Sequence, residues 1–180
     1  MVKIIFETHG TSLDNESGLS SGHHDTDLSK LGEGQARSLG LRYSNTKFSA
    51  VLVSDLKRAY RTAEIAFAGR NDIRIIKDPR LRECNYGDLN HHPDIEVAPK
   101  KLEHISVPFP RGESYEQSNE RIKGFLEELL RNYEDRSVLI IDHQAVRYAL
   151  ECIVNKRTLQ DLISESWKWQ PGWFYELNEL

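Results

Sequence analysis

The sequence contains few cysteines and no long apolar segment. Its two cysteines, Cys84 and Cys152, are not arranged as a CxxC pair, so we expect two reduced thiols with structural roles. No run of about 18 apolar residues occurs, which predicts no membrane-spanning helix and no membrane partner. The first residues, "MVKIIF", lack the pattern of a signal peptide, so we expect a cytoplasmic protein.

An excess of basic residues is also absent. The formal net charge is −4, which argues against nucleic acid as a partner, because neutralising phosphates needs a basic surface. The 180 residues are 38% hydrophobic and 29% charged, as in globular proteins. There is no internal repeat, no low-complexity tract and no linker rich in Gly, Ser or Pro. We therefore predict one domain over residues 1–180.

Short apolar runs alternate along the chain with segments of helical periodicity. Ser29 is a candidate N-cap before one such segment, and Gly69 is a candidate stop after another. The proline-containing residues 84–113 are expected to be irregular. Strands that alternate with helices predict an α/β sandwich with a largely parallel sheet. The expected strands are 3–6, 50–54, 72–76, 137–142 and 172–177, and the expected helices are 29–45, 55–69, 113–133 and 145–154.

Polar residues follow three of the predicted strands. His9 and Gly10 come after the first strand, Arg58 comes shortly after the second, and His143 comes directly after the strand at 137–142. In parallel sheets, ligands bind beyond the carboxyl ends of the strands. We therefore expect two histidines and an arginine to converge on one rim of the sheet.

This set of residues suits phosphoryl transfer to a histidine. A neutral imidazole such as His9 attacks phosphorus, Arg58 and His143 can neutralise the phosphoryl oxygens, and Glu83 on a loop can supply the proton. Gly10 would let the backbone approach a tetrahedral anion. Each residue taken alone also has an ordinary explanation. A histidine after a strand is commonly a hydrogen-bonding loop residue, and Arg58 and Glu83 suit a solvated surface.

Two pairs of adjacent histidines invite a metal interpretation. Neither His23-His24 nor His91-His92 has the HxxxH or HxH spacing that directs two imidazoles at one ion, and no carboxylate cluster accompanies them. We therefore predict no metal site. The aromatic stretch at 167–175 is interpreted as core and closing strand rather than as a ligand cage.

Six segments match, in order, a known set of motifs. They are "FETHGTSLDNESG", "SSGHHDTDLSKLGEGQA", "VLVSDLKRAYRTAE", "DPRLRECNYGDL", "RGESYEQSNERIKGFLEEL" and "VLIIDHQAVRYAL". They resemble the histidine phosphatase superfamily, in its phosphoglycerate mutase-like branch. That family's first signature is Arg-His-Gly followed by Glu-Thr and an asparagine, and here His9, Gly10 and Asn15 match it. The resemblance covers residues 3 to about 155.

The resemblance implies a three-layer α/β/α sandwich with a mostly parallel sheet. It also implies a phosphatase that acts on a small phosphorylated metabolite and releases inorganic phosphate, without a metal or nucleotide cofactor. In that reading His9 becomes phosphohistidine, Arg58 and His143 hold the phosphoryl group, and Glu83 donates and accepts the proton. Family members include monomers and dimers, so we expect a monomer or a homodimer. The residues expected to bind phosphate or substrate are Thr8, Gly10, Asn15, Ser21, Gly22 and Gln144.

The sequence departs from the family pattern at Thr8. The motif has an arginine there, which contacts the phosphoryl group. A hydrogen bond to a charged group is worth about 1.5–3 kcal/mol, so its loss would lower phosphate affinity or rate roughly tenfold to a hundredfold. Without that cation, we expect His9 to keep its proton to higher pH. Thr11 is a second departure, because the motif usually has glutamate or glutamine there.

The segment around the second histidine also departs from the pattern. Gln144 and Ala145 replace two glycines, and the Gln144 amide is a candidate donor to phosphate. Asp142 would repel a phosphate, so we expect it to point away or to pair with a base. Arg61 and Arg147 are candidate cations that replace the missing charge, although both also suit ordinary surface positions.

Three functions remain open from the sequence. Hydrolysis of a phosphomonoester is favoured, because the long insertion typical of phosphoglycerate mutases does not fit a chain of 180 residues. A mutase that returns the phosphoryl group to its substrate is the second. A weakly active or non-catalytic member that binds a phosphorylated ligand or a protein is the third, and Thr8 is the feature that favours it.

Overall fold

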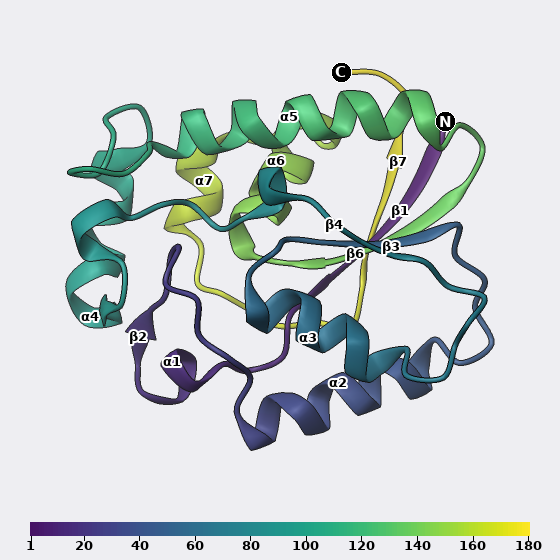
Figure 1. The fold of residues 1–180 in the computed structure, drawn as a ribbon. Coiled ribbons are helices and arrows are strands. Elements are labelled where there is room, and N and C mark those ends of the chain that lie inside the picture. The colour runs from purple at the N-terminus through teal and green to yellow at the C-terminus, as the bar shows by residue number, and fades with distance from the viewer.

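A five-stranded sheet forms the centre of the protein (Figure 1). The structure is a computed structural model and describes residues 1–180. The strand order is β4-β3-β6-β1-β7, and all neighbours are parallel except β1 and β7. The closing strand β7 therefore forms an antiparallel edge. The strands are β1 (Val2–Thr8), β3 (Ala50–Val53), β4 (Ile75–Lys77), β6 (Ser137–Asp142) and β7 (Trp173–Leu177).

Helices cover both faces of this sheet, which confirms the predicted three-layer sandwich. Successive side chains of a strand point to opposite faces. On β6, Leu139 and Ile141 pack with the helices of one face, whereas Val138 and Ile140 belong to the larger core on the other face. The first face carries α2 (Lys30–Arg42) and α3 (Lys57–Ala66), and the second carries α5 (Tyr115–Asn132), α6 (Gln144–Val154) and α7 (Leu159–Ser164) (Figure 1).

Local sequence signals explain where several helices begin. The Ser29 side chain accepts a hydrogen bond from the Gly32 amide and caps α2, as predicted. Ser114 and Gln117 form a capping box at the start of α5. Helix α3 ends at Ala66, before the predicted stop at Gly69, which adopts a positive φ of 81° in the following turn. No helix of the structure is long and apolar enough to cross a membrane.

The segments between the central strands form a smaller layer beside the sheet, at the left of Figure 1. The region predicted as irregular contains short helical turns and a strand of two residues. That strand pairs with another short strand near the N-terminus to form a separate antiparallel ribbon. The elements are α1 (Leu13–Glu16), β2 (Leu19–Ser20), β5 (His92–Pro93), α4 (Asp94–Val97) and 3₁₀ helices at Pro79–Leu81, Gly87–Leu89 and Ala98–His104.

Candidate active site

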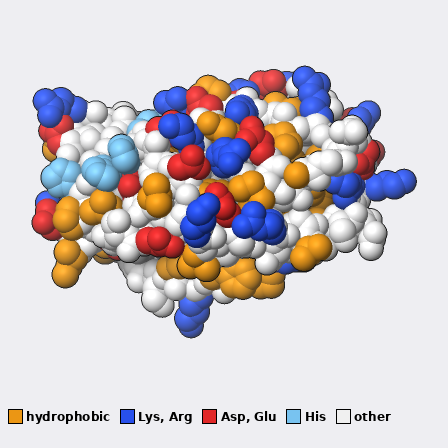
Figure 2. Space-filling model, turned by 60° about the horizontal axis from the view of Figure 1, so that its bottom comes forward, with side chains coloured by type: hydrophobic (Ala, Val, Ile, Leu, Met, Phe, Trp, Pro, Cys, Tyr) orange, Lys and Arg blue, Asp and Glu red, His pale blue; other side chains and the backbone are white.

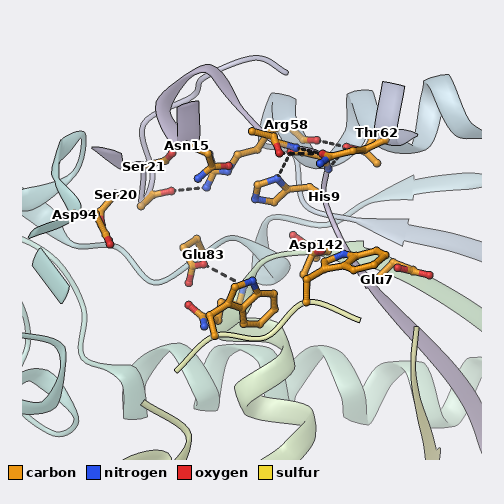
Figure 3. Close-up of a pocket in the computed structure, with 18 of the residues that line it drawn as sticks. Glu7, His9, Asn15, Ser20, Ser21, Arg58, Thr62, Glu83, Asp94 and Asp142 are labelled. Atoms are coloured by element: carbon orange, nitrogen blue, oxygen red, sulfur yellow. Dashed lines mark hydrogen bonds between the residues drawn. The ribbon is translucent and has the colours of Figure 1, made fainter. Parts of the chain in front are cut away.

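A cavity of about 880 Å³ opens where β1 and β6 end. Figure 3 shows His9 at its centre, with Arg58 and Asn15 on one side and Glu83 and Asp142 on the other. Residues from the smaller layer and from the segment after α7 complete its walls. The lining includes these residues predicted from the sequence: Thr8, His9, Gly10, Asn15, Ser21, Gly22, Arg58, Glu83 and Gln144.

His9 is held in the tautomer that a nucleophile needs. Its Nδ1 atom lies 2.7 Å from the carbonyl oxygen of Gly10. A carbonyl oxygen only accepts hydrogen bonds, so Nδ1 carries the proton and Nε2 carries the lone pair. Burial and, to a smaller extent, the nearby Arg58 charge lower the pKa of His9 to about 3, against the opposing effect of the hydrogen bond to Gly10. Burial and the Arg58 charge thus act on His9 in the direction in which the motif arginine would act, while the expectation that Thr8 lets His9 keep its proton to higher pH than an arginine there would stays a prediction.

The second histidine lies against the first in the interior. The His9 and His143 rings have centroids 5.1 Å apart. His143 Nε2 is 2.7 Å from the Ser54 hydroxyl and 2.9 Å from Asp142 Oδ1, and Nδ1 is buried without a partner. Asp142 also accepts the Ser54 amide hydrogen at 2.7 Å. Asp142 is thus directed toward a base, one of the two expected arrangements, although its Oδ1 atom makes no hydrogen bond and the residue also lines the cavity.

Burial disfavours charge on both members of this pair. It raises the pKa of Asp142 well above its usual value, against hydrogen bonds from Ser54. It lowers the pKa of His143 well below its usual value, and the Arg58 charge acts in the same direction. The pair therefore adds little negative charge to the floor of the cavity.

Arg58 is oriented by the loop that follows β2. Its side chain is 2% exposed, and two of its nitrogens donate to the carbonyl oxygens of Gly22 and His24 at 2.8 and 2.9 Å. A guanidinium has five N–H donors in a rigid fork, so the others remain for an anion. Gly22 allows this arrangement, because it has a positive φ of 52° and a Cβ there would lie 2.0 Å from Asn90 Oδ1.

Gly10 is required for packing rather than for access to an anion. A Cβ at this position would lie 2.6 Å from the carbonyl oxygen of Gly32 at the start of α2. The Gly10 amide donates to the Thr62 hydroxyl at 3.0 Å, so it is not free to bind phosphate. Thr62 in turn donates to the Arg58 carbonyl at 2.6 Å. Thr62 was not predicted as a site residue, and its contacts join the nucleophile loop to the helix that carries Arg58.

Glu83 sits at the amino end of α6. Its carboxylate accepts the amide hydrogens of Cys84, Gln144 and Ala145 at 2.8, 3.2 and 3.2 Å. The free amides at a helix N-terminus suit an anion. They fix the carboxylate on the side of the cavity opposite Arg58 (Figure 3).

The other predicted binding residues offer hydrogen-bonding groups at the cavity wall. Asn15 uses its side-chain oxygen to accept the Ser12 amide in a capping box, which leaves its NH₂ group for a ligand. Ser21 has a buried hydroxyl without a hydrogen-bond partner. Thr11 is engaged elsewhere, because its amide and hydroxyl both contact the Gln35 side chain.

The positions of Arg61 and Arg147 do not support a role in replacing the missing motif arginine. Arg61 lies 3.3 Å from Glu64, on the outer side of α3. Arg147 lies between the rings of Trp167 and Trp173, each 5.4 Å from its guanidinium carbon. Neither lines the cavity.

Arg42 is a cavity-lining cation that the sequence analysis missed. It pairs with Glu7, a buried carboxylate that also accepts the Tyr43 hydroxyl at 2.7 Å. Its guanidinium carbon is 5.8 Å from the Trp169 ring. The helical pattern of α2 gives no sign of this role, because Glu7 and Trp169 come from distant parts of the chain.

Comparison with known proteins matches the chain to one family. Residues 4–168 match the model of the histidine phosphatase superfamily (branch 1). The chain is 32% identical over 160 residues to phosphoserine phosphatase 1 of Hydrogenobacter thermophilus, which covers 84% of this chain and 75% of that protein. It is 30% identical over 159 residues to the probable phosphoglycerate mutase GpmB of Erwinia tasmaniensis, which covers 79% and 70%.

A solved structure extends the likeness to the whole fold. Bacillus stearothermophilus YhfR superposes with a TM-score of 0.85 at 26% identity, over 99% of this chain and 92% of that one. The agreement includes both ends of the chain, outside the residues matched by the family model.

Proposed function

Because the chain belongs to the histidine phosphatase superfamily (branch 1), we propose that it hydrolyses small phosphomonoesters through a phosphohistidine at His9. The observation that carries this proposal is the state of the His9 ring. Its Nδ1–H donates to the Gly10 carbonyl at 2.7 Å, and its pKa of about 3 keeps Nε2 unprotonated. The lone pair of Nε2 is therefore available for attack on phosphorus throughout the physiological pH range.

The first step transfers the phosphoryl group to the protein. Nε2 of His9 forms a bond to phosphorus while the bond to the leaving oxygen breaks. Protonated Glu83 gives its proton to that oxygen, so that an alcohol leaves. Arg58 neutralises the phosphoryl oxygens as the charge on them is redistributed.

The second step returns the protein to its starting state. Glu83, now a carboxylate, takes a proton from water, and the water oxygen bonds to phosphorus as the bond to His9 breaks. The products are inorganic phosphate and neutral His9 with protonated Glu83. Ser21, Asn15 and the Gln144 side chain supply hydrogen-bond donors for the phosphate at the cavity wall.

In this proposal, Thr8 makes phosphate binding weaker than an arginine at this position would, but His9 remains available as the nucleophile. The loss of one charged hydrogen bond corresponds to roughly tenfold to a hundredfold in affinity or rate. The alternative, a member that only binds a phosphorylated ligand or a protein, requires that this loss abolish turnover. The neutral His9 ring and the intact Arg58 anchor favour a working enzyme.

A phosphoglycerate mutase is the second candidate, favoured by the likeness to a protein with that name. The same first step serves both reactions, and they differ in whether water or a second substrate oxygen receives the phosphoryl group. Hydrolysis is favoured by the open mouth of the cavity. Trp167 and Trp169 at this mouth are 43% and 59% exposed, and they provide an apolar wall for the organic part of a substrate.

The test is phosphate release by the purified protein between pH 5 and 8. The substrates are p-nitrophenyl phosphate, phosphoserine and 3-phosphoglycerate. The variants are His9→Ala and, as its matched control at a histidine outside the cavity, His92→Ala. We expect release by the wild type and by His92→Ala, and a loss of at least about a thousandfold in His9→Ala. Turnover that survives His9→Ala would overturn the proposal. Conversion of 3-phosphoglycerate to 2-phosphoglycerate without phosphate release would establish the mutase instead.

A further inference from the structure

Two histidines and an aspartate lie together on the surface beside the catalytic cavity. Asp14 belongs to α1, His24 to the loop after β2, and His91 to the segment just before β5. One ligand atom from each lies within 4.8 Å of the other two. Histidine side chains gather on this part of the surface in Figure 2. None of the three residues lines the catalytic cavity.

We propose that Asp14, His24 and His91 form a binding site for a divalent transition metal ion, with zinc as the expected ion. Two imidazole nitrogens and one carboxylate oxygen are a donor set that zinc prefers. Water completes the coordination on the solvent side. The site is separate from the phosphoryl-transfer chemistry and does not depend on it.

The distances from Asp14 to both histidines suit a shared ion, and the ligand atoms of the two histidines, which lie within 4.8 Å of each other, would move closer on binding. His24 Nδ1 is 2.8 Å from one oxygen of Asp14, and His91 Nδ1 is 3.3 Å from the other. Ligands of one zinc ion lie about 2.0–2.2 Å from it, so two of them are separated by at most about 4.4 Å. The ion would take the place of the protons that now lie between Nδ1 of each imidazole and the carboxylate, and each neutral ring would then carry its proton on Nε2.

The three side chains differ in exposure, so that the site has a buried carboxylate and two histidines open to solvent. Asp14 is 5% exposed, whereas His24 and His91 are 43% and 49% exposed. An ion can therefore approach from solvent and meet a carboxylate that is fixed in the protein. The two imidazole rings already lie side by side, with centroids 4.0 Å apart and planes inclined by 41°.

The backbone holds these segments in register before any ion binds. The His91 amide donates to the Ser20 carbonyl at 2.8 Å, and the His24 amide donates to the Ser21 carbonyl at 2.8 Å. His91 keeps a positive φ of 62°, in the left-handed region that few residues other than glycine and asparagine adopt readily. Such preorganisation lowers the conformational cost of binding.

Only one histidine of each adjacent pair belongs to this cluster. His23 Nε2 contacts the Glu83 carbonyl at 2.7 Å, and His92 Nδ1 lies 3.9 Å from Glu96. The spacing within each adjacent pair therefore gives no sign of this site. The fold joins the second member of one pair to the first member of the other.

A bound ion would also stabilise the loop that orients Arg58. The carbonyl oxygen of His24 is one of the two acceptors of the Arg58 guanidinium. The ion would hold the side chain of His24 to Asp14 on α1 and to His91 in the segment before β5. A bound ion would thus join three segments of the smaller layer to one another.

The test is calorimetric titration of zinc into metal-free protein, with His91→Asn and His24→Gln as ligand variants. Asparagine tolerates the backbone conformation of His91, and His92→Asn is the matched control. We expect one zinc ion per chain, with affinity at least about tenfold weaker in both ligand variants and unchanged in His92→Asn. Thermal unfolding in the presence of a chelator checks that all variants are folded.

A second measurement uses thermal unfolding with added metal. At the same zinc concentration, the rise in Tm should be smaller for His91→Asn than for the wild type and His92→Asn, because the stabilisation by a ligand that prefers the folded state falls as its affinity falls. Magnesium should have no such effect, because it prefers oxygen ligands. Absence of zinc binding, equal affinity in all variants or an equal effect of magnesium would overturn the proposal.

Discussion

The floor and the mouth of the cavity are built in different ways. The floor is formed at the ends of the neighbouring parallel strands β1, β6 and β3, where Asp142, His143 and Arg58 are 0%, 1% and 2% exposed. The mouth is formed by segments that come from distant parts of the chain, and its side chains are exposed, as Trp169 shows at 59%. Burial therefore controls the ionisation of the floor, whereas solvent screens charges at the mouth.

In the proposed mechanism, this difference compensates in part for Thr8 in place of the motif arginine. In water, a missing arginine beside His9 would leave the imidazole close to its ordinary pKa. On the buried floor, desolvation and Arg58 together lower that pKa to about 3. The floor thus keeps a neutral nucleophile, and the missing arginine weakens the binding of the phosphoryl group alone.

The largest expected contrast comes from removing one cation from each region. Arg58→Gln should lower kcat/KM for p-nitrophenyl phosphate by about 10²–10³, because it removes a preorganised, desolvated donor. Lys101→Gln at the mouth removes a screened charge and should change kcat/KM by less than about threefold. Steady-state kinetics of the two variants measure the contrast, and equal losses would show that the floor has no special electrostatic role.

Restoring the motif arginine should raise activity. Thr8→Arg adds a charged donor beside His9, so we expect kcat/KM to rise roughly tenfold to a hundredfold. Thr11→Arg adds the same charge at the cavity wall two residues past the nucleophile and serves as the control. A similar gain in both variants would mean that general attraction of the anion, rather than a specific contact, explains the effect.

The packing of the nucleophile loop can be tested with two glycines. Gly10→Ala places a Cβ 2.6 Å from the Gly32 carbonyl oxygen, so we expect the free energy of unfolding to fall by about 1–3 kcal/mol. Gly34→Ala on α2 meets nothing within 4 Å and should stabilise the protein by up to about 1 kcal/mol. Urea unfolding measures both, and an unchanged stability of Gly10→Ala would contradict the close approach.

The smallest expected effect concerns the ionisation of His9, which should stay neutral between pH 8 and pH 5. A lowered pKa means that the neutral form of His9 persists on acidification until about pH 3, whereas an unperturbed histidine is mostly protonated below about pH 6.5. NMR of the ring nitrogens should show Nδ1–H and unprotonated Nε2 in His9 from pH 8 down to pH 5. Protonation of His9 near pH 6.5 would contradict the structure.

The floor was largely predictable from the sequence, and the mouth was not. His9 and His143 follow a strand directly and Arg58 comes shortly after one, so strand prediction and the rule for parallel sheets place these three residues together. The position of Asp142 predicted only that it points away from the phosphate or pairs with a base, and its carboxyl lies beside His143. Two features of the floor could not be predicted: the contacts of Thr62, and the close approach of Gly10 to Gly32 that requires a glycine at position 10. Both depend on distances between segments that are far apart in the sequence.

The mouth depends on contacts between residues far apart in sequence. Arg42 reaches Glu7 and Trp169 only through the packing of α2 against the sheet. The cluster of Asp14, His24 and His91 likewise needs the β2–β5 ribbon, which joins segments more than 60 residues apart. Periodicity and local spacing carry no information about such contacts.

The most direct test of the account is to trap the phosphoryl group on the protein. Rapid quenching during turnover of p-nitrophenyl phosphate, followed by mass spectrometry of peptides at alkaline pH, locates any phosphohistidine. The account predicts an acid-labile phosphate on the peptide that contains His9, at the Nε2 atom, and none in His9→Ala. A phosphate found on another residue during turnover would contradict the account. So would turnover without any phosphorylated intermediate, if the same conditions let Thr8→Arg accumulate one.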